Sequence, residues 1–189
     1  MNSRGTLDSH LSKMKARIGY EYSKLKPYLN LMSQSDRKLI VNSKLRSILD
    51  YGTPLYMAET EGLRSKLEAS HMTLNRIIHG GLTFKVNNSK ICKRIGCELP
   101  DKHIKKISAR YIQKHMYHKQ CPAIIDKLVV PKREASVVYM RKPQLGVYPA
   151  SLDKLIQLYN KLPTDTKTMK PQRFKRYLAK NDLNKNQRS

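Results

Sequence analysis

Residues 33–81 read SQSDRKLIVNSKLRSILDYGTPLYMAETEGLRSKLEASHMTLNRIIHGG. Apolar side chains recur there in steps of three and four, which is the spacing of one face of a helix. The first group is Val41, Leu45, Ile48 and Leu49, and the second is Leu63, Leu67, Leu74, Ile77 and Ile78. We therefore expect two amphipathic helices that pack antiparallel and bury both apolar faces.

Capping and turn residues predict where these two helices begin and end. Ser33 suits an N-cap, and Asp36 three residues later resembles a capping box. Gly52 and Pro54 predict the end of the first helix, because glycine leaves helical geometry cheaply and proline cannot donate the next hydrogen bond. The second helix is expected to start near Thr60 and to end at Gly80-Gly81.

The chain before residue 33 predicts one more amphipathic helix. Residues 2–8 are polar and suggest a tail. Apolar residues at helical spacing then run from Leu11 to Leu25, and Pro27 is expected to end this helix.

Two helices are expected after Gly81. A short one at 89–95 would be capped by Asn88 or Ser89 and ended by Gly96. Pro100 suits the first turn of the second, longer helix. The expected apolar face of that longer helix is Ile104, Ile107, Tyr111 and His115, with Ile112 and Met116 at its edge.

The C-terminal third is less regular. Residues 123–130 predict a short apolar helix or a buried strand, and 136–140 predict a short strand between prolines. Helical segments are expected at 151–160 and 173–179. Residues 181–189 are polar, which predicts disorder. The fold class is therefore predicted to be all-α, with a short irregular basic C-terminal extension.

Charge is the main functional signal in the composition. Among 189 residues there are 38 Lys and Arg against 14 Asp and Glu, a net charge of +24. Such an excess predicts an anionic partner, most simply nucleic acid, and a membrane surface is the weaker alternative. No apolar run approaches the length of a spanning helix, and residues 1–17 lack a signal-peptide apolar region. Three cysteines without such a signal suggest free thiols in a reducing compartment.

The sequence shows no pattern typical of an active site. There is no glycine-rich phosphate loop, no nucleophile elbow and no His-Glu-x-x-His motif. A two-metal polymerase or nuclease site needs clustered carboxylates, whereas the aspartates here are scattered singly. We therefore expect no enzymatic activity from this chain by itself and no cofactor.

One group of residues has the chemistry of a metal site. Its members are Cys92, Cys97, His115, His118 and Cys121. Zinc takes four thiolate or imidazole ligands in a tetrahedron, but this spacing matches no common closed site. The alternative is that Cys92 is a small buried hydrophobe and that His118 and Cys121 mark a helix end.

Two basic clusters are candidate nucleic-acid contacts. The first lies on the helix after Pro100 and comprises Lys102, Lys105, Lys106, Arg110 and Lys114. The second lies near the C-terminus and comprises Arg173, Lys175 and Arg176. Cations repeated along a helix can follow a phosphate backbone, with Tyr111, Gln113 or Tyr117 nearby for stacking or sugar contacts. The alternatives are solvated helix faces or, for the second cluster, a nuclear localisation signal.

The order of short motifs resembles the C-terminal end of a non-LTR retrotransposon reverse transcriptase of the jockey-like kind. The segments that carry the resemblance are Thr6-Leu7-Asp8, Leu49-Asp50-Tyr51-Gly52-Thr53-Pro54-Leu55-Tyr56, Arg76-Ile77-Ile78-His79-Gly80, Ile95-Gly96-Cys97-Glu98-Leu99-Pro100, Tyr159-Asn160-Lys161-Leu162-Pro163, Phe174-Lys175 and Tyr177-Leu178. They span almost the whole chain, in the family's order.

The resemblance implies a thumb and post-thumb region. It predicts a thumb-like helical domain at 1–130 and an irregular linker, short helices and a disordered basic tail at 131–189. The implied function is binding of template-primer, as RNA, DNA or hybrid. The implied partner within a full-length protein is the palm, whose catalytic aspartates have no match here. Tyr51, Pro54 and Leu55 would be structural and would set the angle between the paired helices.

Other classes of function remain open at this point. A small basic structural protein of a ribonucleoprotein would share the size and charge, although it would carry its charge in extended tails. A zinc-dependent nucleic-acid-binding module would need the cysteine and histidine set. The expected location is the nucleus or the cytoplasm, without a membrane partner.

Overall fold

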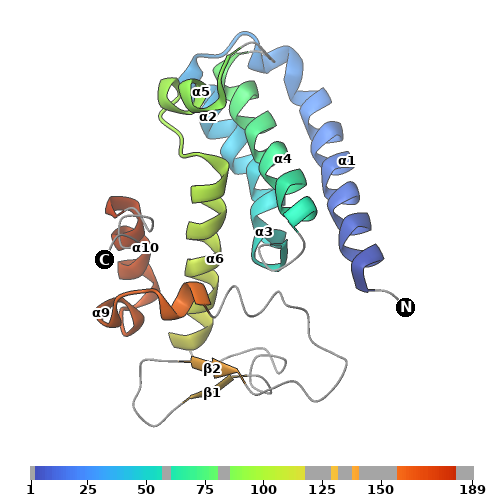
Figure 1. The fold of residues 1–189 in the computed structure, drawn as a ribbon. Helices are drawn as coiled ribbons and strands as arrows, with labels where there is room; N and C mark the ends of the chain where they lie inside the picture. The colour runs from blue at the N-terminus through green and yellow to red at the C-terminus, as the bar shows by residue number, and fades with distance from the viewer. Residues whose placement is uncertain are drawn as a thin grey trace. The chain divides into compact units, whose positions relative to one another are not determined.

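The computed structural model describes residues 3–56, 61–80, 86–117, 129–131, 138–140 and 157–181 (Figure 1). Most of these residues are helical, which confirms the all-α class. The chain divides into two compact units, Met1–Tyr56 with Thr60–His103, and Met57–Glu59 with Ile104–Ser189. This division falls at residue 103, whereas the sequence predicted a change from helical to irregular structure near residue 130.

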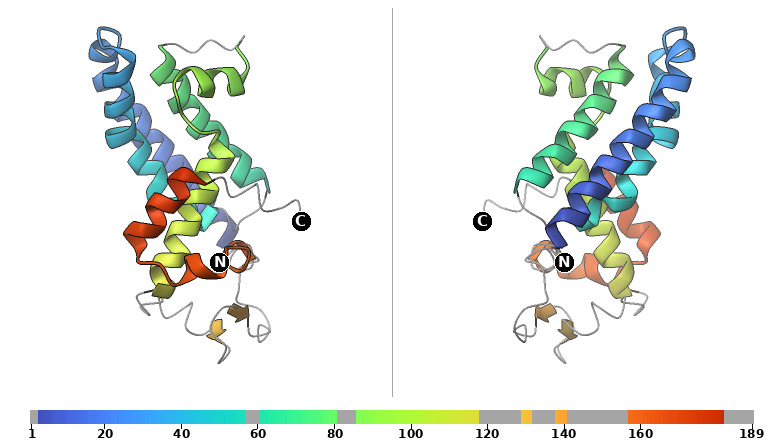
Figure 2. Two further views of the ribbon diagram at one scale, coloured as in Figure 1. Left: turned by 90° about the vertical axis from the view of Figure 1, so that its left-hand side faces the viewer. Right: turned by 90° about the vertical axis from the view of Figure 1, so that its right-hand side faces the viewer.

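In the first unit, long helical segments lie side by side (Figures 1 and 2). The elements are α1 (Ser3–Leu29), α2 (Gln34–Ile40), the π-helical η1 (Val41–Arg46), α3 (Ser47–Tyr56), α4 (Glu61–His79) and α5 (Asn88–Arg94). Because α2, η1 and α3 follow one another without a break, they form one continuous helix. Tyr56 at its end hydrogen bonds with His10 near the start of α1, so the two run antiparallel.

The caps at the centre of the unit lie where the sequence predicted them. The Ser33 hydroxyl accepts a hydrogen bond from the Asp36 backbone N–H at 3.2 Å, which confirms the N-cap of α2. Gly80 ends α4 with a φ of 104°, a conformation that favours glycine. For α5 the expected cap was wrong by one or two residues, because the Asn87 side chain accepts from the Ser89 backbone N–H.

Prolines end neither of the two helices that they were expected to end. α1 continues through Pro27 to Leu29, whose side chain is buried, and it also includes residues 3–8 of the expected polar tail. α3 continues through Gly52 and Pro54 to Tyr56. A proline inside a helix loses one hydrogen bond, and burial of Tyr56 offsets that loss.

Gly52 has a packing role instead of a terminating one. A Cβ at this position would lie 3.0 Å from Cε2 of Tyr56 and 3.5 Å from the side chains of His10 and Met14. Glycine therefore allows α1 and the end of α3 to approach closely.

Both expected apolar faces are buried in the first unit, except that Ile48 of the first face is only half-buried. Val41, Leu45 and Leu49 on η1 and α3 are fully buried, and so are Leu67 and Ile78 on α4. Leu11 and Met14 extend this core onto α1. At the usual gain of about 1.5–3 kcal/mol for each large apolar side chain, this core supplies the main stabilisation of the unit.

Helix α6 (Pro100–Tyr117) begins at Pro100, as expected, and continues into the second unit. Its buried face differs from the expected one by part of a turn, since Ile107 and Tyr111 are only half-buried. The buried positions are Ile104, Ser108, Ala109, Ile112 and Gln113. Gln113 is therefore not the surface contact that the sequence suggested; its side-chain amide donates to the Met169 carbonyl.

The second unit also contains a two-stranded ladder and short helices. Strand β1 (Val129–Pro131) pairs antiparallel with β2 (Val138–Met140), and Val130 faces Tyr139 in the register. The expected strand at 136–140 is thus confirmed for its last three residues. Helices follow at 157–160, at α9 (Thr164–Lys167) and at α10 (Pro171–Lys180). The other predictions for 118–128, 141–156 and 182–189 lie outside the described residues.

Candidate nucleic-acid interface

The basic cluster on α6 is less accessible than the sequence suggested. Lys102, Lys105, Lys106 and Arg110 are half-buried, and Lys114 is exposed. The long stems of lysine and arginine can lie along the protein while the charged ends reach water, so half-burial is compatible with the predicted phosphate contacts. The cluster remains a candidate, with its most accessible charge at the C-terminal end of the helix.

The basic cluster on α10 is exposed to solvent. Arg173, Lys175, Arg176 and Lys180 are all exposed, and the helix contains no acidic residue. Within the part of the chain that the structure describes, none of these four cations takes part in an ion pair.

Two buried side chains, Phe174 and Leu178, hold α10 in place. They occupy positions i and i+4 on one face of the helix, and the four cations lie on the remaining surface. The ring of Phe174 also stacks on the ring of Tyr177 at a centroid separation of 6.3 Å. The helix is therefore amphipathic: its apolar face is buried, and its positive charges are exposed to solvent.

A third basic surface was not found from the sequence. It is a hollow between α1 and α3, lined by His10, Lys13, Met14, Arg17, Ser47, Ile48 and Tyr51. Tyr51 is 89% exposed there, so the prediction that it is structural was wrong. Pro54 is buried, as expected of a structural residue, and the side chain of Leu55 lies outside the described residues. Lys13 and Arg17 are exposed beside Tyr51, which combines charge with an aromatic face.

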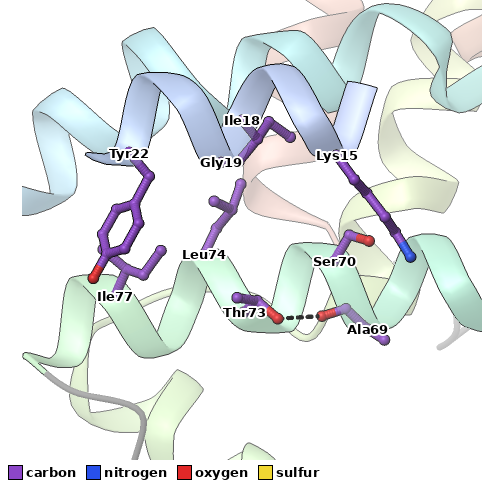
Figure 3. Close-up of a pocket in the computed structure, with 9 residues that line it drawn as sticks. All are labelled: Lys15, Ile18, Gly19, Tyr22, Ala69, Ser70, Thr73, Leu74 and Ile77. Atoms are coloured by element: carbon purple, nitrogen blue, oxygen red, sulfur yellow. Dashed lines mark hydrogen bonds between the residues drawn. The ribbon is translucent and has the colours of Figure 1, made fainter. Parts of the chain in front are cut away.

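A second hollow, between α1 and α4, is mainly apolar (Figure 3). Leu74 points from α4 toward Gly19 on α1, and Lys15 extends from α1 toward Ser70. The Thr73 hydroxyl donates to the Ala69 carbonyl at 3.0 Å and so stays within α4. Because Gly19 contributes no side chain, this hollow follows from loose packing between the two helices.

Cys92 of the candidate zinc set is buried, as the alternative interpretation expected. Cys92 is 3% exposed, and its Sγ accepts a hydrogen bond from the Asn75 side-chain amide at 3.3 Å. Burial raises the pKa of this thiol, which disfavours the thiolate that zinc requires. Cys97 is half-buried. The side chains of His115, His118 and Cys121 lie outside the described residues, so zinc binding by this set stays a hypothesis.

The structure brings together three other metal-binding side chains that the sequence analysis did not connect. Asp50, His71 and His103 come from α3, α4 and α6, all within the first unit. His103 Nε2 lies 3.0 Å from Asp50 Oδ1, and His71 Nε2 lies 4.0 Å from the same oxygen. Burial, with the nearby charge of His103, lowers the pKa of His71 to about 3 and keeps its ring neutral.

Comparison with known proteins adds no family assignment, because no family model, curated protein or solved structure matches this chain significantly. The class defined by the described residues is therefore an all-α protein with strongly basic helices. None of its described helices is both long and apolar enough to cross a membrane.

Proposed function

We propose that this protein binds nucleic acid through phosphate contacts made by α10. The observation that carries the proposal is a group of exposed cations on a helix that has no acidic residue and is anchored by buried apolar side chains. These cations are Arg173, Lys175, Arg176 and Lys180. Within a chain of net charge +24, these cations supply a local positive field on a defined surface. The Arg110–Lys114 end of α6 is a second contact of the same kind.

Affinity in this proposal comes mainly from the release of counterions. Each phosphate that a Lys or Arg neutralises adds about 0.9 to the slope of log affinity against log salt on duplex DNA. Such contacts follow the backbone and read little sequence. We therefore expect binding that weakens steeply with salt and varies little among duplexes of different sequence.

The hollow between α1 and α3 would add contacts to unpaired bases. An exposed tyrosine can stack on any base, and this is worth about 1–3 kcal/mol per base in single-strand-binding proteins. Lys13 and Arg17 beside Tyr51 would neutralise the flanking phosphates. A substrate with a duplex and a single-stranded overhang would use both kinds of contact.

A template-primer is such a substrate, and this agrees with the resemblance to the thumb of a jockey-like reverse transcriptase. Two of the segments that carry the resemblance lie at helix ends, since Tyr56 closes α3 and His79 closes α4. In this proposal the chain holds template-primer and does not polymerise DNA by itself, because no match to the catalytic aspartates of the palm is present. Reading the genomic sequence upstream of Met1 tests this assignment: an in-frame palm with an Asp-Asp pair supports it, and unrelated coding sequence contradicts it.

The binding surface is tested by charge reversal in two variants that change the net charge by the same amount. R173E/K175E/R176E removes three cations of α10, and the control K90E/K93E/R94E removes three exposed cations of α5. Affinity for a fluorescent RNA–DNA duplex with an overhang is measured by anisotropy across a salt series. We expect the α10 variant to weaken binding by at least about tenfold and to lower the salt slope by about 3, one for each lost contact.

The control variant separates a defined surface from net charge alone. Both variants change the net charge equally, so an equal loss of affinity would contradict a site on α10. Unchanged affinity of the α10 variant together with a large loss in K106E/R110E/K114E would move the site to α6. Selective, salt-resistant binding of a structured RNA by the wild-type protein would favour a ribonucleoprotein component over a template-primer-binding thumb.

A further inference from the structure

Three side chains of metal-binding type, each from a different helix, lie together within the first unit. Asp50 lies on α3, His71 on α4 and His103 near the start of α6. Their candidate ligand atoms, one carboxylate oxygen and two imidazole nitrogens, all lie within 4.8 Å of one another. The two imidazole rings meet edge to face at a centroid distance of 5.2 Å.

His71 is the side chain that a simple packing role does not explain. It is 1% exposed, and neither of its ring nitrogens has a hydrogen-bond partner among the described residues. A buried polar group without a partner costs about 1–3 kcal/mol, so each such group calls for a reason. The Asp50 carboxylate oxygen Oδ1 lies 4.0 Å from His71 Nε2, which is too long for a hydrogen bond.

We propose that Asp50, His71 and His103 bind one divalent transition-metal ion of the zinc class. A metal between these atoms would give His71 Nε2 the partner that it lacks. It would also join α3, α4 and α6 at one point. This inference is independent of the proposed nucleic-acid binding, because it uses none of the exposed cations of α10.

The spacing of the three ligand atoms suits such an ion. Zinc lies about 2.0–2.2 Å from nitrogen and oxygen ligands, so two ligands of a tetrahedral site are about 3.3 Å apart. The observed separations are 3.0 Å between His103 Nε2 and Asp50 Oδ1, and 4.0 Å between His71 Nε2 and the same oxygen. Side-chain adjustments of about 1 Å would bring all three to bonding distance.

The kinds of ligand select the class of metal. Two imidazoles and one carboxylate favour zinc, cobalt or nickel over calcium and magnesium, which prefer oxygen alone. With three protein ligands, a water molecule would complete a tetrahedron. Asp50 is 30% exposed and His103 is 23% exposed at the side chain, so an ion can enter from solvent on that side.

The surroundings predict moderate affinity. Metal-ligating histidines usually donate their other ring N–H to an acceptor, and loss of such a partner costs about 10–100-fold in affinity. Nδ1 of His71 has no acceptor within the described part of the chain. We therefore expect binding of Zn²⁺ in the micromolar range.

The experiment measures binding of Zn²⁺ by isothermal titration calorimetry and binding of Co²⁺ by visible absorption, both with the full chain. The ligand variants are Asp50→Asn and His103→Gln, chosen because both side chains are partly exposed and tolerate substitution better than His71 does. The matched control is His79→Gln, a half-exposed histidine at the end of α4. Proton NMR of the wild-type imidazoles follows His71 and His103 directly and needs no variant.

We expect one equivalent of Zn²⁺, a rise in melting temperature, shifts of the His71 and His103 resonances, and at least about tenfold weaker binding in both ligand variants. His79→Gln should bind as the wild type does. Absence of Zn²⁺ binding, or unchanged resonances of His71 and His103 at saturation, would overturn the proposal. A thiolate-to-cobalt charge-transfer band that disappears in Cys92→Ser or Cys97→Ser would also overturn it and would assign the metal to the cysteine set.

Discussion

Replacement of Tyr56 by phenylalanine tests how the first unit is held together. Tyr56 is fully buried at the end of α3, and its hydroxyl lies 2.6 Å from Nδ1 of His10 on α1. The hydroxyl also donates to the Leu7 carbonyl at 3.4 Å. Tyr56→Phe keeps the ring and removes these bonds, so at pH 8 we expect a loss of about 1 kcal/mol in the free energy of unfolding.

The same structure predicts that alkaline pH reverses this order of stability. Burial, with the charge of Asp8, raises the pKa of Tyr56 from 10.0 to about 12. The unfolded chain therefore loses the tyrosine proton first, and the wild type loses stability as pH rises from 10 through 12. A pKa shift of two units corresponds to a loss of at most about 2.7 kcal/mol in the free energy of unfolding. We reduce this expected loss to about 1–2 kcal/mol, because half-exposed His10 leaves the Tyr56 hydroxyl partly screened by water.

The assay is urea unfolding followed by circular dichroism at several pH values between 8 and 12. Loss of charge on the many lysines changes the stability of wild type and variant alike. The difference in stability between the two proteins therefore reports the contribution of Tyr56 alone. We expect the two curves of stability against pH to cross near about pH 11. The control is Tyr51→Phe, whose ring is 89% exposed and which should change stability by less than about 0.5 kcal/mol at pH 8. Equal stability of Tyr56→Phe and wild type at every pH would refute the reasoning.

Three further predictions concern two glycines of the first unit and one buried phenylalanine of the second. Gly80→Ala should destabilise by at least about 1–2 kcal/mol, because φ is 104° and a Cβ would lie 2.5 Å from Arg37 Nη1. Gly19→Ala should instead stabilise by about 0.5–1 kcal/mol, since nothing lies within 4 Å of its Cβ; thermal unfolding of both variants checks the opposite signs. Phe174→Ala should cost about 3–5 kcal/mol because the ring is fully buried, and hydrogen exchange should show loss of protection in α10 while α4 stays protected.

Local signals in the sequence predicted the helices and several of their ends. The Ser33 cap, the glycine end at Gly80 and the start of α6 at Pro100 each depend on a few neighbouring residues, which is why they could be read directly. The helix ends expected at Pro27 and Pro54 were wrong because burial elsewhere outweighed the lost hydrogen bonds.

The candidate functional surfaces were only partly predictable. The cluster of Arg173, Lys175 and Arg176 was visible in the sequence because these basic residues lie close together, and all three are exposed. Exposure of Tyr51 could not be predicted, because the π-helical Val41–Arg46 places more residues in each turn and changes which face α3 presents. The hollow between α1 and α3 depends on that face.

By itself the sequence determined the all-α class, the caps, the two apolar faces at the centre of the first unit and the strongly positive charge. These are properties of periodicity and composition, and they need no knowledge of distant contacts. Only the tertiary structure brought residues 50, 71 and 103 to one point. Packing of three helices decides which side chains meet, and the spacing of residues along the chain carries no such information.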